Sequence, residues 1–331
     1  MKTAINSGLP YITFKDTINR YNPMKDEGTI PAFNLCVESS SNITPEQTHT
    51  CILTSLVLPF IKDKDIPRLS ATGIDILNIL KNITKLDNDR SSKHIDKYSV
   101  VGLGTFGLHD YLASKMVNYE DSKETVDTLF ARISYYAVKR SSELGKQFGN
   151  FKTFEQSTYK NGYILGRHPK SFNTNNGELD WIKLSEQTSL NMANAQLLAI
   201  APGTSAALSL GVTANILPTF SKIFSERTKM GDIPRMPLYI DKYPMGYKEY
   251  KYVDHYKVNT VISTVAKYID SSIAYEMVFD LNNEKHKDIN YIWSVIKDAW
   301  KKEIKTIYYF RWIKPNSDQI SEAEECITCG S

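Results

Sequence analysis

The chain has 331 residues, of which 41% are hydrophobic, 23% charged and 11% aromatic, and its net charge is +3. This is the composition of an ordinary globular protein with room for one large domain or two smaller ones. A small net charge without a basic cluster argues against a nucleic-acid partner, and no apolar run reaches the roughly 18 residues of a membrane span. The N-terminus contains no apolar stretch of signal-peptide length, so we expect a cytoplasmic protein with reduced thiols.

The first part of the chain predicts short strands and loops. Residues 11–14 are β-branched or aromatic and predict a strand, and residues 30–38 predict a second short extended segment. Residues 51–60 form a nearly continuous apolar run, which is typical of a strand buried on both faces, as in an α/β barrel.

Two long helices are predicted from apolar residues at helical spacing. The first spans residues 121–144, with Asp121 or Ser122 at its start and Gly145 after its end. The second spans about residues 288–302. The side chains expected to face inward are Val126, Leu129, Phe130, Ile133 and Ala137 in the first helix, and Ile289, Ile292, Ile296, Ala299 and Trp300 in the second.

Residues 306–312 predict a strand after the second helix, and beyond them the chain becomes polar and acidic. We expect a folded part over residues 1–312 and a flexible tail over residues 313–331, because the tail has little apolar surface to bury. Alternation of apolar strands with long helices predicts an α/β fold, either open or closed.

The four cysteines are too few for a disulfide scaffold in a chain of this length, so any importance they have is chemical. Cys326 and Cys329 form a C-x-x-C pair in the tail, which suits thiol–disulfide exchange. Half of a zinc site and an incidental pair are the alternatives. Cys36 and Cys51 are widely spaced and lie in apolar surroundings, which argues against one shared zinc site.

A candidate reactive thiol lies in residues 34–38, which read N-L-C-V-E. In an extended segment Asn34, Cys36 and Glu38 point to the same side, so an amide, a thiol and a possible general base form one row. A cysteine buried in a strand for structural reasons is the alternative. The residues alone favour that alternative.

Residues 34–38 also resemble the finger-loop motif of class I ribonucleotide reductase large subunits. Residues 7–20 resemble the approach to that loop, Cys51 follows at about the spacing of the family's second active-site cysteine, and residues 305–309 resemble its paired tyrosines. Cys326 and Cys329 are similar to its C-terminal shuttle thiols. Residues 194–218 align without gaps with its phosphate-loop region. The motifs cover nearly the whole chain in the family's order.

This resemblance implies an α/β fold that is the C-terminal half of the family's ten-stranded barrel, with a finger loop and a flexible C-terminal tail. It implies that Cys36 becomes a thiyl radical and abstracts the 3′ hydrogen of a ribonucleoside diphosphate. Glu38 would accept the proton of the 3′ hydroxyl, and Asn34 would hydrogen-bond the substrate. Cys51 would be one of the two thiols that reduce the 2′ position.

The resemblance also implies partners. Tyr308 and Tyr309 would pass the radical to Cys36 from a separate small subunit, which would carry a dimetal or tyrosyl-type radical cofactor. Cys326 and Cys329 would reduce the active-site disulfide again and be reset by thioredoxin or glutaredoxin. No cofactor or metal is expected in this chain itself.

Substrate phosphate is expected to bind at the loop formed by Pro202, Gly203, Thr204, Ser205 and Ala206, where backbone N–H groups could hold an anion. Here the sequence departs from the family pattern, because Gly203, Ala206 and Ala207 replace hydroxyl or acidic positions. Ser271 is a second departure, since the family usually has glutamine there.

Residues 102–107 read G-L-G-T-F-G and match the dinucleotide-binding pattern, with Asp121 at roughly the spacing of the acidic residue that such a site needs. The family has a glycine-rich turn between a strand and a helix in this region. We favour that structural interpretation over a nucleotide site.

The family's large subunit is far longer than this chain, and no cysteine precedes Cys36. The partner thiol of Cys51 is therefore expected on another polypeptide, as in the naturally split subunits of some phages, in which case the chain acts in a host cytoplasm. A truncated gene is the alternative. A half-barrel would expose apolar strand edges, so we expect an obligate complex with an N-terminal fragment. The rival functions are a non-catalytic or regulatory reductase-like subunit and an unrelated C-x-x-C thiol oxidoreductase.

Overall fold

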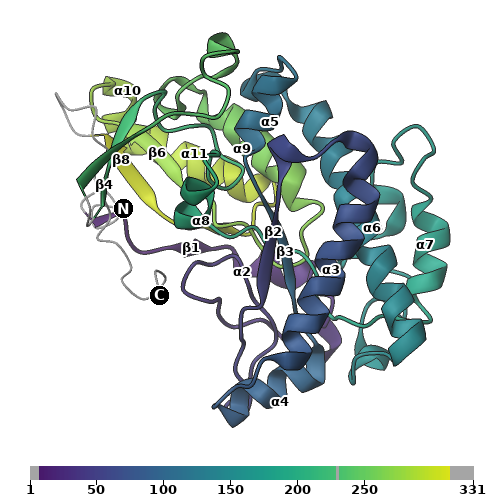
Figure 1. Ribbon diagram of the computed structural model, residues 1–331. Coiled ribbons are helices and arrows are strands. Elements are labelled where there is room, and N and C mark those ends of the chain that lie inside the picture. The colour runs from purple at the N-terminus through teal and green to yellow at the C-terminus, as the bar shows by residue number, and fades with distance from the viewer. Residues whose placement is uncertain (1–6, 229–230, 314–331) are drawn as a thin grey trace.

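The structure is a computed structural model that describes residues 7–228 and 231–313 (Figure 1). Its main helices are α2 (Lys15–Arg20), α3 (Ile66–Ile83), α4 (Asp89–Tyr98), α5 (Leu108–Ser114), α6 (Lys123–Phe148), α7 (Trp181–Thr188), α8 (Thr204–Ser209), α9 (His255–Ala266), α10 (Glu284–Lys287) and α11 (Ile289–Lys301). Its strands are β1 (Ile12–Thr13), β2 (Leu53–Val57), β3 (Gly102–Phe106), β4 (Phe224–Thr228), β5 (Gly231–Arg235), β6 (Met277–Asp280), β7 (Thr306–Ile307) and β8 (Phe310–Ile313). This mixture confirms the predicted α/β class. Over the described ranges, no helix has both the length and the apolar character needed to cross a bilayer.

Parallel pairing follows the order of the chain. Strand β2 pairs with β3, Leu103 of β3 bridges Leu198, and Ile200 bridges Ile273, all in parallel. Strand β6 then pairs in parallel with β8. Each parallel segment therefore lies next to the segment that follows it, without the reversal of direction that marks a doubly wound sheet. Among the described residues the strand pairs do not close into a ring.

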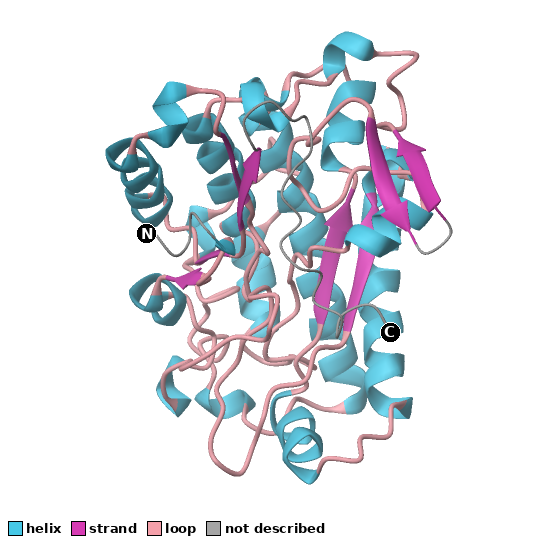
Figure 2. Ribbon diagram, turned by 90° about the vertical axis from the view of Figure 1, so that its left-hand side faces the viewer, coloured by secondary structure: helices cyan, strands magenta, loops and turns pink. Residues whose placement is uncertain are grey.

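Helices fill the connections between these parallel segments. In Figure 1, α3, α6 and α7 lie on one side of β2 and β3, whereas α9 and α11 lie beside β6 and β8. Figure 2 shows the molecule turned by 90°, with two-stranded pairs of magenta strands set among the cyan helices. One continuous apolar cluster joins the helices to the strands, from Ile74 of α3 through Phe130 of α6 to Phe279 of β6.

Helix α6 confirms the first predicted helix and corrects its end. All five side chains expected to face inward are buried, and Ser122 is the residue at the N-cap position. Gly145 does not terminate the helix, which continues to Phe148. A Cβ atom at Gly145 would lie 2.7 Å from backbone atoms of Met192, so this glycine lets a second chain segment pass close to the helix.

Helix α11 confirms the second prediction with two exceptions. Asp288 caps it by accepting a hydrogen bond from the backbone N–H of Asn290 at 2.9 Å. Ile292, Ile296 and Ala299 are buried as predicted. The predicted burial of Ile289 and Trp300 is wrong, because both lie at the edge of the apolar stripe and remain more than 40% exposed.

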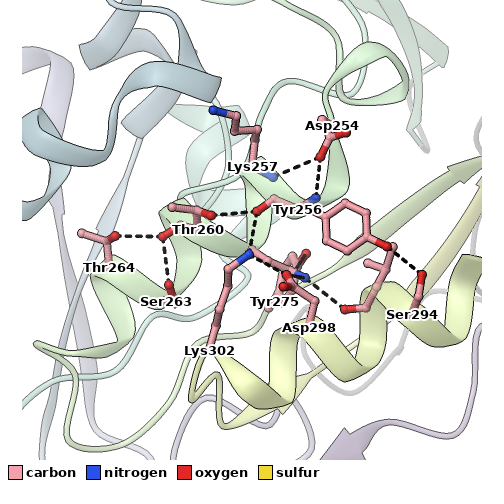
Figure 3. Close-up of polar contacts among 12 residues, drawn as sticks. Asp254, Tyr256, Lys257, Thr260, Ser263, Thr264, Tyr275, Ser294, Asp298 and Lys302 are labelled. Carbon is pink, nitrogen blue, oxygen red and sulfur yellow. Dashed lines mark hydrogen bonds and ion pairs between the residues drawn. The ribbon is translucent and has the colours of Figure 1, made fainter.

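Polar contacts join α9 to α11 and to the segment before β6 (Figure 3). The hydroxyl groups of Tyr256 in α9 and Ser294 in α11 lie 2.7 Å apart. Tyr275 donates to Asn259 of α9 at 2.7 Å, and Asn259 donates to Asp298 of α11 at 2.9 Å. This network fixes Tyr275, whose carbonyl accepts a hydrogen bond from the N–H of Tyr308.

Three predicted strands differ from the structure. Residues 306–312 form two short strands, because β7 pairs antiparallel with β1 whereas β8 pairs with β6. Residues 30–38 form loop and turn. The apolar run 51–60 contains β2 followed by a 3₁₀ turn, and the side chains of β2 are only half-buried. The expected burial on both faces is therefore wrong for the described chain.

The glycine-rich segment 102–107 is the predicted turn from a strand to a helix. A Cβ atom at Gly104 would lie 2.5 Å from the carbonyl oxygen of Ala199 in the neighbouring segment. Gly107 has a φ of +75° and packs against Pro59. Close packing and the turn into α5 therefore account for these glycines without a bound nucleotide.

Because three histidines are fully buried, we expect the free energy of unfolding to decrease at acidic pH. Burial lowers the pKa of His94 to about 4, of His109 to about 3 and of His255 to about 4. The unfolded chain binds these protons below about pH 6.5, so the stabilisation is complete above that pH and is lost as the pH falls toward the folded pKa values. At pH 5.5 each histidine lowers the free energy of unfolding by roughly 1 kcal/mol, so the three together lower it by a few kcal/mol.

Urea unfolding of the protein at pH 7.5 and 5.5 tests this expectation. The exposed His168 offers a control, because H168Q should leave the difference between the two pH values unchanged. Equal stability at both pH values would contradict the prediction.

Candidate active site

The thiol of Cys36 lies on a tight turn and not on the extended segment that we predicted. The N–H of Asn34 donates to the carbonyl of Ser39, and the N–H of Val37 donates back to the carbonyl of Asn34. Val37 has a φ of +55°, a left-handed conformation that is unfavourable for a β-branched residue. The correction has a physical reason: the reversal of the chain lets this turn approach the segment that precedes β6.

The turn still brings the predicted amide and carboxylate together. The side-chain N–H of Asn34 donates to Oε1 of Glu38 at 2.7 Å. Glu38 is only 2% exposed, and burial raises the pKa of its carboxyl group above the usual range. Its second oxygen, Oε2, is buried without a hydrogen-bond partner among the described residues. A carboxylate with raised basicity and one unoccupied oxygen is suited to accept a proton.

The two predicted tyrosines lie next to the thiol. The hydroxyl of Tyr308 lies 3.8 Å from Sγ of Cys36, and the rings of Tyr308 and Tyr309 are 4.1 Å apart between centroids. Both tyrosines lie at the break between β7 and β8. Tyr11, from the segment around β1, packs against both rings at 4.8 and 5.2 Å. Burial raises the pKa of Tyr308 far above its usual value, so its phenol stays protonated.

An ion pair borders the second tyrosine. The guanidinium of Arg311 lies 5.4 Å from the ring centroid of Tyr309 and pairs with Glu276, with Nη2 and Oε1 at 3.0 Å. Glu276 is almost completely buried. Since a buried charge pair holds its geometry through several contacts, it restrains β8, which begins directly after Tyr309.

A buried lysine, Lys305, lies directly before β7 and connects the segment of the two tyrosines to the Cys36 turn. The ammonium group of Lys305 donates to the carbonyls of Ile269, Asp270 and Ser271 at 2.6–2.9 Å. The next N–H, that of Ser272, donates to the backbone carbonyl of Glu38 at 2.8 Å. Lys305 therefore fixes residues 269–271, and the neighbouring Ser272 holds the Cys36 turn.

Within residues 7–228 and 231–313, the other predicted site residues lie outside this buried cluster. Cys51 is exposed and lies two residues before β2, which begins at Leu53. The expected phosphate loop, with Pro202, Gly203, Thr204, Ser205 and Ala206, forms the entry to α8, and Thr204, Ser205 and Ala206 are exposed. Cys326 and Cys329 lie outside the described residues.

The structure explains one departure in the phosphate loop. Gly203 has a φ of +57°, and a Cβ atom there would lie 2.0 Å from the ring of Phe106 at the end of β3. Any larger residue would have to displace this ring, so glycine is required by packing. The second departure, Ser271, is buried, and its hydroxyl has no hydrogen-bond partner among the described residues.

Sequence reasoning missed several residues around the turn. Ser39 donates its N–H to Oδ1 of Asn34 at 3.1 Å and lies 2.6 Å from the ring of His49. Arg311 and Glu276 were not singled out either. Their only signal in the sequence is a charged residue within or directly before an apolar strand, which is weak on its own.

Comparison with known proteins decides the family. A family model described as the barrel domain of ribonucleotide reductase matches residues 1–310. The chain belongs to the ribonucleotide reductase family. This confirms the family expected from the ordered motifs, and it gives the Cys36 turn and the two tyrosines a common context.

The similar proteins are named as alpha subunits of ribonucleoside-diphosphate reductase. The protein from Synechocystis sp. is 34% identical over 100% of this chain and 44% of its own length. The one from Helicobacter pylori strain J99 is 25% identical and the one from Bacillus subtilis 27% identical, each over 98% of this chain and 49% of its own length. The chain thus spans about half the length of these ribonucleotide reductase relatives.

Proposed function

We propose that this chain is the C-terminal catalytic part of a ribonucleotide reductase large subunit, which reduces ribonucleoside diphosphates to deoxyribonucleoside diphosphates. The observation that carries the proposal is the contact of 3.8 Å between the Tyr308 hydroxyl and Sγ of Cys36. It joins a redox-active side chain to a buried thiol, beside a carboxylate with an unoccupied oxygen.

The chemistry at the turn begins when the tyrosyl radical of Tyr308, formed by prior loss of an electron and a proton, takes a hydrogen atom from Cys36. This restores the Tyr308 phenol and leaves a thiyl radical on Cys36. The sulfur then takes the 3′ hydrogen atom of the ribose, which restores the thiol and leaves a carbon radical. Oε2 of Glu38 accepts the proton of the 3′ hydroxyl, for which its burial and raised pKa are suited. Asn34 orients Glu38 through its amide and can turn the same group toward the substrate.

Reduction at the 2′ carbon requires two thiols. Cys51 and a thiol outside this chain supply two electrons and two protons, the 2′ hydroxyl leaves as water, and the two sulfurs form a disulfide. The exposure of Cys51 agrees with a thiol that meets a partner from another segment. Cys326 and Cys329 reduce that disulfide by thiol–disulfide exchange and are themselves reduced by thioredoxin or glutaredoxin.

The radical enters the chain through Tyr309 and then Tyr308. Their rings are in contact, and Tyr308 reaches the thiol, so each step crosses only a short distance. Because the phenol of Tyr308 stays protonated, its oxidation must release a proton together with an electron. The radical originates on a small subunit with a dimetal or tyrosyl-type cofactor. Substrate phosphate binds at residues 202–206, mainly through backbone N–H groups, since Gly203 and Ala206 lack polar side chains.

A complementary N-terminal part of the subunit completes the barrel. Five parallel segments in chain order, with β2 at one margin, support half of a closed ten-stranded barrel. The coverage of 44–49% of the relatives supports the same division. The missing part supplies the second reducing thiol, on the same polypeptide or on a separate one as in split phage subunits.

Reconstitution tests the proposal. This chain is combined with a polypeptide that supplies the N-terminal part and with a small subunit, and conversion of a ribonucleoside diphosphate is measured with thioredoxin present. We expect deoxyribonucleotide formation only with all three proteins. Full activity without this chain, or no reduction by the complete mixture, would contradict the proposal.

A further inference from the structure

A chain of hydrogen bonds runs from the base of the Cys36 turn into the core. The hydroxyl of Ser39 lies 2.6 Å from Nε2 of His49, and Nδ1 of the same ring lies 2.7 Å from the hydroxyl of Ser41. The Ser41 hydroxyl also lies 2.6 Å from Nε2 of His94 in helix α4. Ser39, Ser41 and His94 are each at most 3% exposed.

The geometry makes His49 a bridge. In the extended backbone that follows the turn, side chains two residues apart point to the same side, so Ser39 and Ser41 face one ring. The two ring nitrogens of an imidazole lie on different edges, and each reaches one serine. His49 also packs edge-on against His94, with 5.4 Å between ring centroids. The His49 side chain thus connects Ser39 and Ser41 to helix α4, through its ring contact with His94.

The turn needs such support. Val37 holds a left-handed backbone conformation, which for a β-branched residue persists only where the surroundings enforce it. Ser39 holds the turn in this conformation. Its N–H donates to the side chain of Asn34, and its carbonyl accepts from the N–H of Asn34. Any movement of Ser39 would therefore move the amide that orients Glu38.

We propose that His49 and His94 are positioning residues, which hold the strained Cys36 turn through Ser39 and Ser41 and so aim Asn34 and Glu38 at the substrate. The catalytic part of this inference rests on the proposed function. The clamp on the turn itself does not. Burial lowers the pKa of His49 to about 3, so the bridge joins uncharged groups at neutral pH.

The test uses the complete large subunit that contains this chain, reconstituted with the small subunit. H49F keeps an aromatic ring but removes both bonds to serine. S41A removes the bonds of Ser41 to His49 and to His94 and keeps the bond between Ser39 and His49. H168F is the matched control, because His168 is exposed. H49Q is the conservative variant, since glutamine can still bond one serine or both.

Two measurements are made on each variant. Alkylation of Cys36 by iodoacetamide is followed by mass spectrometry, with the exposed Cys51 as internal reference. We expect H49F to raise the ratio of Cys36 to Cys51 alkylation about tenfold or more and to lower kcat about tenfold with KM nearly unchanged, because orientation and not substrate affinity is lost. S41A should change the alkylation ratio and kcat in the same direction but less. H49Q should have values of both quantities between those of H49F and the parent, and H168F should resemble the parent.

Unchanged alkylation of Cys36 in both H49F and S41A would show that the histidines do not hold the turn. Increased alkylation with an unchanged kcat would show that they hold the turn but do not position the catalytic groups. If H49F fails to fold, S41A and H49Q decide the question. If the parent subunit reduces no nucleotide, the proposed function fails, whereas the alkylation ratios still show whether the histidines hold the turn.

Discussion

Replacement of Cys36 by serine should abolish nucleotide reduction in the reconstituted enzyme. Serine has nearly the same shape, so the buried contact with Tyr308 and the fold of the turn should survive. An O–H bond is much stronger than an S–H bond, so Tyr308 cannot take its hydrogen atom. We expect kcat to fall by more than about four orders of magnitude, which corresponds to at least about 5 kcal/mol in the activation free energy.

The measurement is steady-state formation of deoxyribonucleotide, together with substrate binding and thermal unfolding, both of which C36S should leave nearly unchanged. M245S is a control that also exchanges a sulfur-containing side chain for serine, at a position 88% exposed and outside the site. A C36S enzyme with more than a tenth of the parental rate would show that another group abstracts the hydrogen.

Replacement of Tyr308 by phenylalanine should have the second largest effect. The ring and its contacts with Tyr11 and Tyr309 remain, but the hydroxyl that reaches Sγ of Cys36 is lost. Phenylalanine is also far harder to oxidise than tyrosine. We expect kcat to fall by about three orders of magnitude or more, while substrate affinity and stability stay close to those of the parent.

The chain offers a matched control for the loss of one buried hydroxyl. Tyr159 is completely buried, and its hydroxyl has no hydrogen-bond partner among the described residues. Y159F should therefore retain full activity. Near-normal turnover by Y308F would remove this tyrosine from the radical path and leave it a packing role beside Cys36.

The long helices were the most predictable part of the fold. Periodic apolar residues placed α6 and α11 within a few residues of their ends, because burial of one face dominates the behaviour of such segments. The exceptions have local causes. The helix continues through Gly145, and the glycine leaves room for the backbone of Met192. No pattern within the helix indicates a neighbour from 47 residues away.

The candidate site was predictable only through the family motif. Composition and alternation favoured a structural cysteine in a strand, since nothing nearby indicates that Val37 adopts a left-handed conformation. The contact between Cys36 and Tyr308 joins residues 272 positions apart, and that between Ser41 and His94 joins residues 53 positions apart. Local propensity cannot report such contacts, which depend on how the strands are ordered.

That strand order has a consequence for how the subunit is built. Since each parallel segment from β2 to β8 lies beside its successor in the chain, a cut between two successive segments from β2 to β6 separates one parallel pair, besides the antiparallel pair of β1 with β7. In a doubly wound sheet the same cut would divide interleaved strands. A gene with this arrangement can be broken into two reading frames whose products each keep complete parallel strand pairs and whose strands meet again at one parallel pair and at β1 with β7.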